Sequence, residues 1–406
     1  MFQQLYEKLD DLFQKKENTK DLKQCGGSVY ELFETIRHSI SNSHANSDEL
    51  LNKANALIDY CNETILLYPF KDVPDCWRRM LIDAGLLRTM IQLDELNKEA
   101  TLSKVQSLIG DLDTCCVISG SPGRYWLASD ILDRAQAWIS QQRSIPPRAI
   151  PKRRLPAPEI RYPIKRPERM PSFESFLSHC NQDRPTPFVL RPGLIDHWPA
   201  CERWKSVDYL LKTASDRVIP VEIGRAYTDA GWRQEMMRFA DFIDRYILQE
   251  SEEVAYLAQH DLFYQIPRLA SDMILPDYCH IEPNLNDLYT HRPQEVIKNA
   301  WFGPRGTVSP LHHDPYHNLL VQVVGSKYLR LYDPDQTDRL YPCEGMMNNT
   351  SQVNIEHEID PDQFPKFKEA NYVECILNEG EILYIPPKWW HFVKSLETSF
   401  NVSLWF

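Results

Sequence analysis

The sequence lacks the features that mark several classes of protein. No apolar run approaches the roughly 18 to 20 residues that a membrane-spanning helix needs, and the opening segment MFQQLYEKLDDLFQKKEN is acidic and polar rather than signal-like. We therefore expect a soluble, intracellular protein. The ten cysteines include no C-x-x-C pair. Their scatter predicts buried thiols in a reducing compartment rather than a disulfide framework or a zinc finger.

The sequence also lacks an excess of positive charge. Its 45 Lys and Arg residues face 57 Asp and Glu residues, which gives a net charge of −12. Such a chain has no general attraction to phosphate backbones or anionic membranes, so we expect no direct sequence-specific nucleic-acid binding and no membrane contact. Apolar residues make up 43% and charged residues 25% of the 406 residues. This composition excludes wholesale disorder, and the length predicts about two or three structural units.

Alternation typical of strands is nearly absent before residue 140, where apolar residues recur instead at helical spacing. Such stripes run through residues 48–61, 77–87 and 128–139. We predict that residues 1–142 form an all-helical N-terminal domain of antiparallel hairpins. This region shows no constellation of catalytic residue types, so its expected role is that of a scaffold or a dimerisation surface.

The composition changes abruptly between residues 143 and 171. This segment holds eight prolines, nine basic residues and two acids, a local charge of +7. Prolines at this density predict a stiff, extended, basic linker. The run Pro151-Lys152-Arg153-Arg154 has two interpretations, a nuclear-import signal or a solvated linker whose arginines pair with the acidic domains. We expect the protein in the nucleus, with the cytoplasm as an alternative.

Short segments rich in Val, Ile, Tyr and Phe follow Pro171 and are bounded by Gly, Pro, Asn or Asp. The expected strands cover residues 218–223, 254–258, 319–324, 328–332, 374–377, 382–385 and 400–405. Residues 324–327 and 378–381 carry turn residues and are predicted to form hairpins. Many short strands at such spacing predict a sandwich or a barrel.

A metal site is predicted around the segment Ser309-Pro310-Leu311-His312-His313-Asp314-Pro315. Side chains in a strand alternate between faces, so His312 and Asp314 point the same way and His313 points oppositely. A third ligand must come from another strand, and His391 follows an apolar strand that is bounded by prolines. Two imidazoles and one carboxylate form the facial triad typical of non-haem Fe(II) oxygenases.

Three protein ligands leave room on such an iron for a bidentate 2-oxo acid and dioxygen. The far carboxylate of the oxo acid then needs a cation. Lys327 stands on the strand that follows, and Arg330 on the same strand is the alternative.

The sequence resembles the jumonji-C (JmjC) oxygenases over about residues 171–406. The resemblance is carried by residues 299–304, 309–314, 380–386 and 390–391. It implies that residues 172–406 form a double-stranded β-helix, a cupin-like jelly roll, that uses Fe(II), 2-oxoglutarate and O2. The whole chain is then an α+β protein. The implied site residues are His312, Asp314 and His391 as catalytic iron ligands, and Tyr256, Ser309, Asn318 and Lys327 for 2-oxoglutarate.

Residues 220–224, 256–260 and 276–279, with the helical N-terminal domain, narrow the resemblance to one branch of this family. That branch has been described as arginyl hydroxylases, as peptidases and as histone lysine demethylases. The resemblance implies that Glu222, Trp232, Gln259 and Trp301 line the substrate pocket. The sequence departs from that branch at His313 and His317, where the branch has glutamines.

The function that these residues favour is hydroxylation of an arginine carbon in a protein or peptide substrate, such as a histone or another nuclear protein. A carboxylate with aromatic planes suits a guanidinium, which pairs in bidentate fashion and stacks. Three alternatives stay open. The first is demethylation of methyl-lysine in chromatin regulation, which the same triad can catalyse. The second is peptide hydrolysis by a zinc-loaded site, although we find no separate general base. The third is a cupin-like module that binds without catalysis, although such a module would not need the triad together with Lys327.

Overall fold

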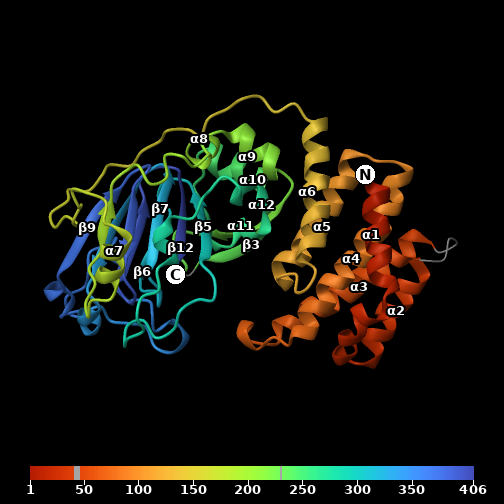
Figure 1. Cartoon of the computed structure of the whole chain (residues 1–406), viewed down its shortest axis with the longest axis horizontal. Helices are drawn as coiled ribbons and strands as arrows, with labels where there is room; N and C mark the ends of the chain where they lie inside the picture. The colour runs from red at the N-terminus through yellow and green to blue at the C-terminus, as the bar shows by residue number, and fades with distance from the viewer. Residues whose placement is uncertain (41–45, 229–230) are drawn as a thin grey trace. The chain divides into compact units, whose positions relative to one another are not determined.

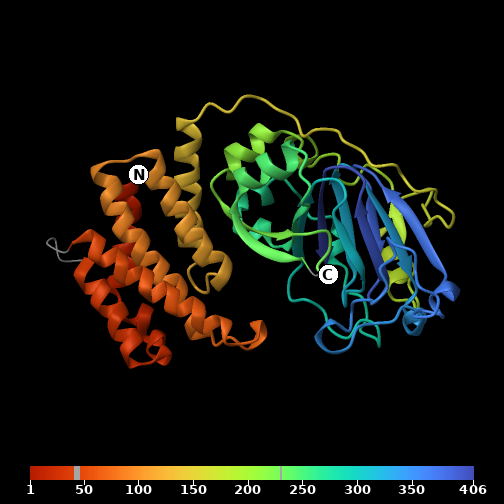
Figure 2. The same ribbon diagram turned by 180° about the vertical axis from the view of Figure 1, so that it is seen from behind.

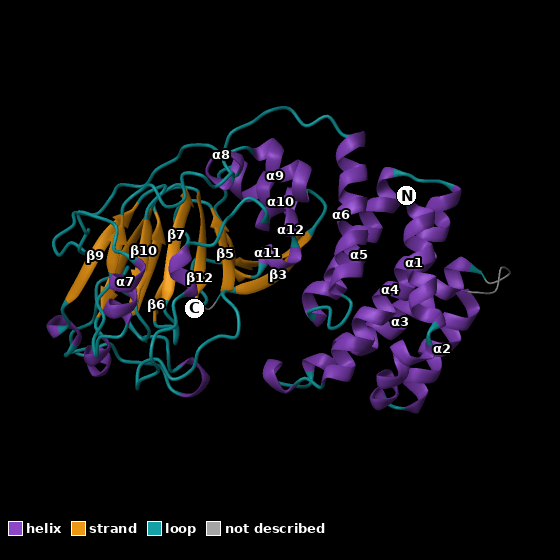
Figure 3. Ribbon diagram, in the orientation of Figure 1, coloured by secondary structure: helices purple, strands orange, loops and turns teal. Residues whose placement is uncertain are grey.

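The structure is a computed structural model that describes residues 1–40, 46–228 and 231–406, and it divides into two compact units. The first unit comprises Met1–Pro146, Leu211–Ile219 and Arg238–Ala240. The second comprises Pro147–Leu210, Pro220–Met237 and Asp241–Phe406. Helices fill the N-terminal part of the chain and the strands gather in the C-terminal part (Figure 3). The predicted α+β class is therefore confirmed.

Among the described residues, six α-helices lie wholly within the first unit. They are α1 (Phe2–Gln14), α2 (Gly27–Ile40), α3 (Ser47–Leu66), α4 (Asp75–Lys98), α5 (Leu102–Ser119) and α6 (Tyr125–Gln142). Helix α4 buries side chains on every side and packs against α1, α3 and α5 (Figure 1). Helix α5 begins at Thr101, whose hydroxyl accepts from the Lys104 amide, and ends at Gly120, which adopts a left-handed φ of 73°. None of the helices described combines the length and the apolar character that a membrane span requires.

A buried ion pair holds residues 211–219 against α5 within the first unit. Arg217 donates from Nε and Nη2 to the two carboxylate oxygens of Asp113, at 2.9 and 3.0 Å. The Val218 amide donates to the same carboxylate. Both charged side chains are almost fully buried. Removing either partner would leave an uncompensated buried charge, so this pair fixes the segment in place.

The C-terminal part of the chain contains two antiparallel sheets, which belong to the second unit apart from Val218, Ile219 and Arg238. Its strands are β1 (Phe188–Leu190), β2 (Val218–Ile223), β3 (Arg233–Arg238), β4 (Ala255–His260), β5 (Ile297–Gly303), β6 (Val308–His312), β7 (Asn318–Val324), β8 (Lys327–Tyr332), β9 (Tyr372–Leu377), β10 (Ile382–Ile385), β11 (Trp390–Ser395) and β12 (Ser399–Trp405). The larger sheet has the order β1-β10-β7-β12-β5-β4-β2-β3, and the smaller has the order β6-β11-β8-β9. The predicted jelly-roll architecture is confirmed.

Both predicted hairpins are wrong. The turn at residues 324–327 joins β7 of the larger sheet to β8 of the smaller sheet. The turn at residues 378–381 joins β9 of the smaller sheet to β10 of the larger sheet. Neither turn therefore joins two paired strands of one sheet. Gly325 makes the first crossing possible because its φ is 77° and a Cβ there would lie 2.1 Å from the Thr398 carbonyl oxygen. Both connections pass from one sheet to the other, so the two sheets face each other.

Aliphatic side chains from both sheets fill the space between them. This core contains Leu320, Leu329, Leu331, Leu377, Leu383 and Ile385. The short helices in this part of the chain are α7 (Phe173–Cys180), α8 (Ala200–Arg203), α9 (Val207–Ala214), α10 (Phe239–Phe242), α11 (Leu262–Gln265) and α12 (Pro267–Ala270). Helix α7 covers the larger sheet at β1 and β10, where Phe176 contacts Phe188 and Tyr384 (Figures 1 and 2).

The proline-rich segment lies in an extended conformation along the second unit from Pro147 onward. The amides of Ile150, Leu155 and Ile164 donate to the carbonyls of Lys205, Leu396 and Glu374. Within the basic run, the Arg153 guanidinium donates to the Leu248 carbonyl and lies 3.7 Å from the Glu250 carboxylate. The segment therefore behaves as part of the β unit's surface.

Candidate metal centre and cosubstrate site

Strands β6 and β11 bring two candidate metal ligands together. His312, the last residue of β6, pairs directly with His391 of β11, and their ring centroids lie 4.2 Å apart. Asp314 follows two residues after His312, and its Oδ2 lies 3.6 Å from His391 Nε2. One ligand atom from each residue lies within 4.8 Å of the other two. This spacing lets the three residues share one ion.

Backbone carbonyls orient both imidazoles. Nδ1 of His312 lies 2.6 Å from the Pro310 carbonyl oxygen, and Nδ1 of His391 lies 2.9 Å from the Trp389 carbonyl oxygen. A carbonyl only accepts, so each Nδ1 carries the proton and donates it. Each Nε2 keeps its lone pair available for a metal. Such outer hydrogen bonds fix the tautomer of metal-binding histidines.

The Asp314 carboxylate at this site needs a cation to balance its charge. Burial raises the pKa of the Asp314 carboxyl and lowers the pKa of His391 to about 3. The site therefore holds a neutral His391 imidazole beside a desolvated carboxylate. A divalent cation stabilises this arrangement, and two imidazole nitrogens with one carboxylate oxygen suit Fe(II) among the transition metals.

A buried lysine lies in the same cavity as the triad. Lys327 begins β8, is 1% exposed and donates from Nζ to the Tyr256 phenol oxygen at 2.8 Å. Ser309 hydrogen-bonds the same phenol. These three residues line one cavity with His312. A buried ammonium and the metal ligands thus bound a single space between the sheets. Arg330 does not share it, because its guanidinium stacks on Tyr372 at 4.3 Å and lies near Glu374.

Unpartnered polar atoms identify the chemistry that this cavity accepts. Among the described residues, Oδ1 of Asn318, Oδ1 of Asn401 and the indole nitrogen of Trp405 are buried without a hydrogen-bond partner, and all three residues line the cavity. A buried polar group without a partner costs about 1–3 kcal/mol, so a ligand that pairs with these groups is favoured. The donors among these groups, the Trp405 indole N–H and the Lys327 ammonium, fit the carboxylates of an oxo-dicarboxylate such as 2-oxoglutarate, whereas the two asparagine Oδ1 atoms accept and suit a ligand that donates.

The affinity for 2-oxoglutarate should fall as the pH rises above neutrality. Burial lowers the pKa of Lys327 to about 7. Below that pH the lysine is protonated and can pair with a carboxylate; above it the free protein must take up a proton in order to bind the dianion. The expected result is a dissociation constant for 2-oxoglutarate that rises by up to about tenfold per pH unit above 7. Isothermal titration of the metal-loaded protein between pH 6 and 9 measures it, and an affinity that increases with pH would contradict the assignment.

The candidate substrate residues lie in three kinds of surroundings. Glu222 in β2 pairs with Tyr256 in β4 and is half-buried, which raises the pKa of its carboxyl, and the Trp232 indole donates a hydrogen bond to it. Trp301 lines the metal cavity, where its indole donates to the Ser403 hydroxyl at 2.9 Å. Gln259 is exposed on β4, has a φ of 45° and lies at an irregularity in the pairing with β5.

The structure places the two unusual histidines outside this cavity. The His313 ring stands at 90° to the Trp390 ring, with centroids 4.6 Å apart. His317 is buried, its Nδ1 lies 2.8 Å from the Tyr384 phenol oxygen and its ring stacks on Phe406. Both therefore contribute to packing around the site rather than to the predicted ligand set.

The comparison with known proteins agrees with this geometry. The family described as "Cupin-like domain" matches residues 174–406. A zebrafish (Danio rerio) protein named "Lysine-specific demethylase 8" is 36% identical over 395 residues, which cover 93% of this chain and 92% of that protein. The chain belongs to the cupin-like JmjC family. The helical unit is thus part of the region shared with a JmjC relative.

Other relatives match mainly the JmjC region. "Lysine-specific demethylase 8" of Xenopus tropicalis is 48% identical over 236 residues, 58% of this chain and 51% of that protein. "Jumonji C domain-containing protein 5" of Drosophila melanogaster is 40% identical over 240 residues, 58% of each chain. The chain thus matches about half the length of the frog relative.

Sequence reasoning missed one wall of the JmjC cavity. Asn401, Ser403 and Trp405 of β12 line it together with Asn318 of β7. The sequence contains a pattern that could have indicated this wall. Residues 401, 403 and 405 have side chains that can form hydrogen bonds, and they alternate with Phe400, Val402 and Leu404. A strand whose buried face is polar predicts a site rather than a core.

Proposed function

We propose that this protein is an Fe(II)- and 2-oxoglutarate-dependent oxygenase that hydroxylates an arginine side chain of a protein substrate. Iron, the oxo acid and O2 would supply the oxidation of a stable C–H bond. His312, Asp314 and His391 would hold the iron. Lys327, Tyr256 and the amide NH2 group of Asn318 would bind the oxo acid, and the position of all three residues in one cavity with the triad supports this assignment.

The observation that favours arginine is the environment of Glu222. Burial raises the pKa of this carboxyl, and among the described residues the neutral Trp232 indole is the side-chain group that hydrogen-bonds to it. A carboxylate that is half-buried without a cation is stabilised by a guanidinium, which can donate two parallel hydrogen bonds. Trp232 is 37% exposed and offers an aromatic face beside it.

Tyr227 connects this carboxylate with the metal site. The negative charges of Asp314 and Glu222 both act on its phenol, while its hydroxyl shares a hydrogen bond with Thr350 at 3.2 Å. Thr350 in turn bridges to His312. A guanidinium held by Glu222 would therefore lie near the metal ligands. The chain's residues would bind and orient the substrate, and the apolar side chains of the cavity would exclude water.

Demethylation of methyl-lysine is the second candidate. Two of the three relatives described above carry demethylase in their names. Trp301 and Tyr256 also present aromatic rings with centroids 5.9 Å apart, and such rings can attract a methylated ammonium. Oxidation of an N-methyl carbon would release formaldehyde, whereas hydroxylation of an arginine carbon leaves a stable alcohol. The same metal site serves both reactions.

Replacing Glu222 by glutamine separates the two candidates. Glu222→Gln keeps the size of the side chain but removes its charge, so a charge-assisted interaction of about 1.5 to 3 kcal/mol is lost. We expect the KM for an arginine peptide to rise by about tenfold or more. Substrate-independent decarboxylation of 2-oxoglutarate should stay near that of the wild type. Mass spectrometry of paired peptides with arginine, lysine or dimethyl-lysine at one position measures this.

The matched control is Glu235→Gln, which changes an exposed carboxylate on β3 that pairs with Arg233. It should hydroxylate arginine peptides like the wild type. Arginine-dependent gain of one oxygen, weakened only by Glu222→Gln, would support the proposal. A wild-type preference for dimethyl-lysine with formaldehyde release, insensitive to Glu222, would replace it by demethylation.

We propose a histone or another nuclear protein as the class of partner, and the nucleus as the location. Both rest on the basic run at residues 151–154 and on the charge of residues 172–406, which hold 21 Lys and Arg against 34 Asp and Glu. An acidic oxygenase domain favours basic protein segments.

A further inference from the structure

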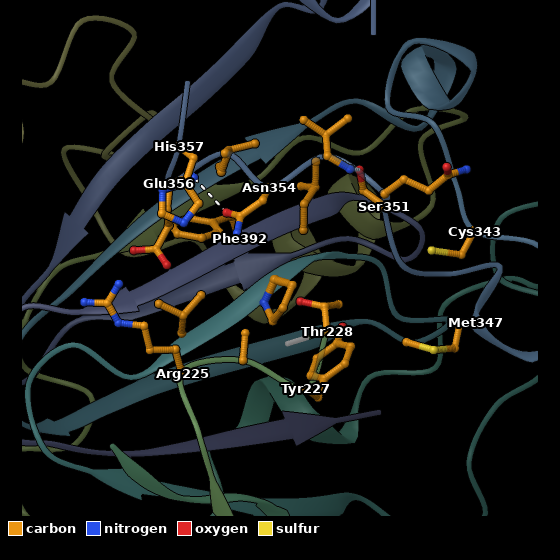
Figure 4. A pocket seen from close by; sticks show the side chains of 17 residues that line it. Arg225, Tyr227, Thr228, Cys343, Met347, Ser351, Asn354, Glu356, His357 and Phe392 are labelled. Carbon is orange, nitrogen blue, oxygen red and sulfur yellow. Dashed lines mark hydrogen bonds between the residues drawn. The ribbon is translucent and has the colours of Figure 1, made fainter. Parts of the chain in front are cut away.

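A groove of about 410 Å³ lies on the outer face of the smaller sheet (Figure 4). Its floor contains Val308 and Leu311 of β6 and Phe392 of β11, which belong to an apolar cluster distinct from the core between the sheets. Residues 225–228 form one wall, and residues 343–357 contribute the other. The metal cavity lies on the other side of β6, where Ser309 and His312 point into it.

The groove follows β6 along its length. At one end Thr350 bridges to His312. At the other end Glu356 pairs with Lys394 at 2.7 Å, and Lys394 lies opposite Val308 in the sheet. The wall from Thr350 to Glu356 therefore spans all five residues of β6. At about 3.3 Å per residue this length accommodates an extended peptide of about four residues.

The groove has an apolar floor and a charged end. Arg225, Glu356 and His357 gather at one end, while Tyr227 and Met347 lie at the other (Figure 4). The Tyr227 end adjoins the metal site, because the Tyr227 hydroxyl shares its hydrogen bond with Thr350 beside His312. A chain that leaves the metal site past Tyr227 would enter the groove directly.

The segment that forms this wall carries negative charge. Residues 340–365 include Glu344, Glu356, Glu358, Asp360 and Asp362 but no lysine or arginine. Arg225 on the opposite wall is exposed, and only Glu356 among the five acids has Lys394 as an ion-pair partner in the described structure. Among the described residues that line the groove, Glu356 is the one acid, while Glu344 and Glu358 adjoin the lining residues Cys343 and His357 in sequence, so the wall segment as a whole favours a ligand segment with basic residues.

We propose that this groove binds an extended, basic segment of the substrate polypeptide beside the target arginine, with one apolar side chain of that segment seated on its floor. Extended peptides are recognised in part through pockets for alternate side chains. Here Pro310, Leu311 and Phe392 form the pocket, while the backbone at Leu311–His313, at the end of β6, is already paired with residues 349–351. The inference rests on the proposed oxygenase function and adds a requirement on the sequence that flanks the target.

Two neighbouring methionines provide a matched test. Met347 lines the groove, whereas Met346 is 99% exposed and does not line it. Met347→Lys places an ammonium group in the groove, where the basic segment would lie. Met346→Lys adds the same charge at the neighbouring residue, outside the groove. We expect Met347→Lys to raise the peptide KM by about tenfold and Met346→Lys to change it less than about twofold, with unchanged substrate-independent decarboxylation.

The peptide side of the test uses a library with a fixed arginine flanked by lysines. A single leucine is moved from one to five residues away on either side, with alanine elsewhere. We expect one leucine position to lower the KM by about tenfold in the wild type and in Met346→Lys, but not in Met347→Lys. Equal behaviour of the two variants, or no preferred leucine position, would overturn the groove assignment.

Failure of the groove assignment can be distinguished from failure of the proposed arginine hydroxylation. Should the wild type oxidise dimethyl-lysine instead of arginine, the same library with dimethyl-lysine at the fixed position tests the groove. A preserved contrast between the methionine variants then supports the groove while arginine hydroxylation is rejected. Hydroxylated arginine without that contrast supports the function and rejects the groove.

Discussion

Replacing His312 or Asp314 by alanine is expected to abolish the turnover of 2-oxoglutarate and to weaken Fe(II) binding by more than about 100-fold. Loss of a residue that hydrogen-bonds to a metal ligand typically weakens metal affinity by 10- to 100-fold. Loss of one of the three ligands themselves should weaken the affinity for Fe(II) by more than this. His312 and Asp314 each contribute one of the three clustered ligand atoms. Metal titration under anaerobic conditions and detection of succinate measure the two effects.

His313→Gln is the matched control for these variants. His313 lies between the two ligands in sequence, but its ring packs against Trp390 outside the cavity. The variant should bind Fe(II) and turn over 2-oxoglutarate within about twofold of the wild type, because the His313 side chain lies outside the ligand cavity and a substitution rarely changes a site that it does not touch. Equal losses in all three variants would refute the alternation of side chains around β6.

The second large effect is expected from Lys327→Met, which keeps the length of the side chain and removes its charge. The KM for 2-oxoglutarate should rise by about tenfold to 100-fold, because a charge-assisted hydrogen bond worth about 1.5 to 3 kcal/mol disappears. The pH dependence of the affinity above pH 7 should disappear with it. Kinetics at several oxo-acid concentrations and two pH values test both statements.

Lys205→Met serves as the control because Lys205 pairs with Glu379 at the surface, at 3.1 Å, away from the cavity lining. It should leave the KM for 2-oxoglutarate unchanged, since exposed ion pairs contribute little. An unchanged requirement in Lys327→Met would contradict the cosubstrate assignment outright, because Arg330 points away from the cavity and stacks on Tyr372.

The parts of the site that follow from local periodicity could be predicted from the sequence. His312 and Asp314 are two residues apart at the end of a strand, so their convergence follows from alternation alone. The helices of the first unit follow in the same way from their apolar stripes. The pairing of His391 with His312 depends on two strands that are distant in sequence, so the residues indicated His391 only as a candidate third ligand, and the resemblance to the JmjC family then implied the same role.

Features that depend on long-range packing could not be predicted. Gly325 signals a tight turn, but only the packing against Thr398 shows that this turn crosses between sheets. The wall of the groove formed by residues 343–357 is a loop without periodicity, so its position over β6 depends on bridges such as that of Thr350 with His312. The cavity wall at Asn401 was visible in the alternation of β12, but residues 400–405 were predicted only as a strand and not as part of the site.

Anaerobic reconstitution with Fe(II) and 2-oxoglutarate, followed by admission of O2 and a proteome-derived peptide screen read by mass spectrometry, tests the central claim most directly. The wild type should add one oxygen atom to arginine in a subset of peptides, in step with succinate formation. Asp314→Ala should add none. Loss of methyl groups from lysine with formaldehyde release, and no oxygen on any arginine, would contradict arginyl hydroxylation.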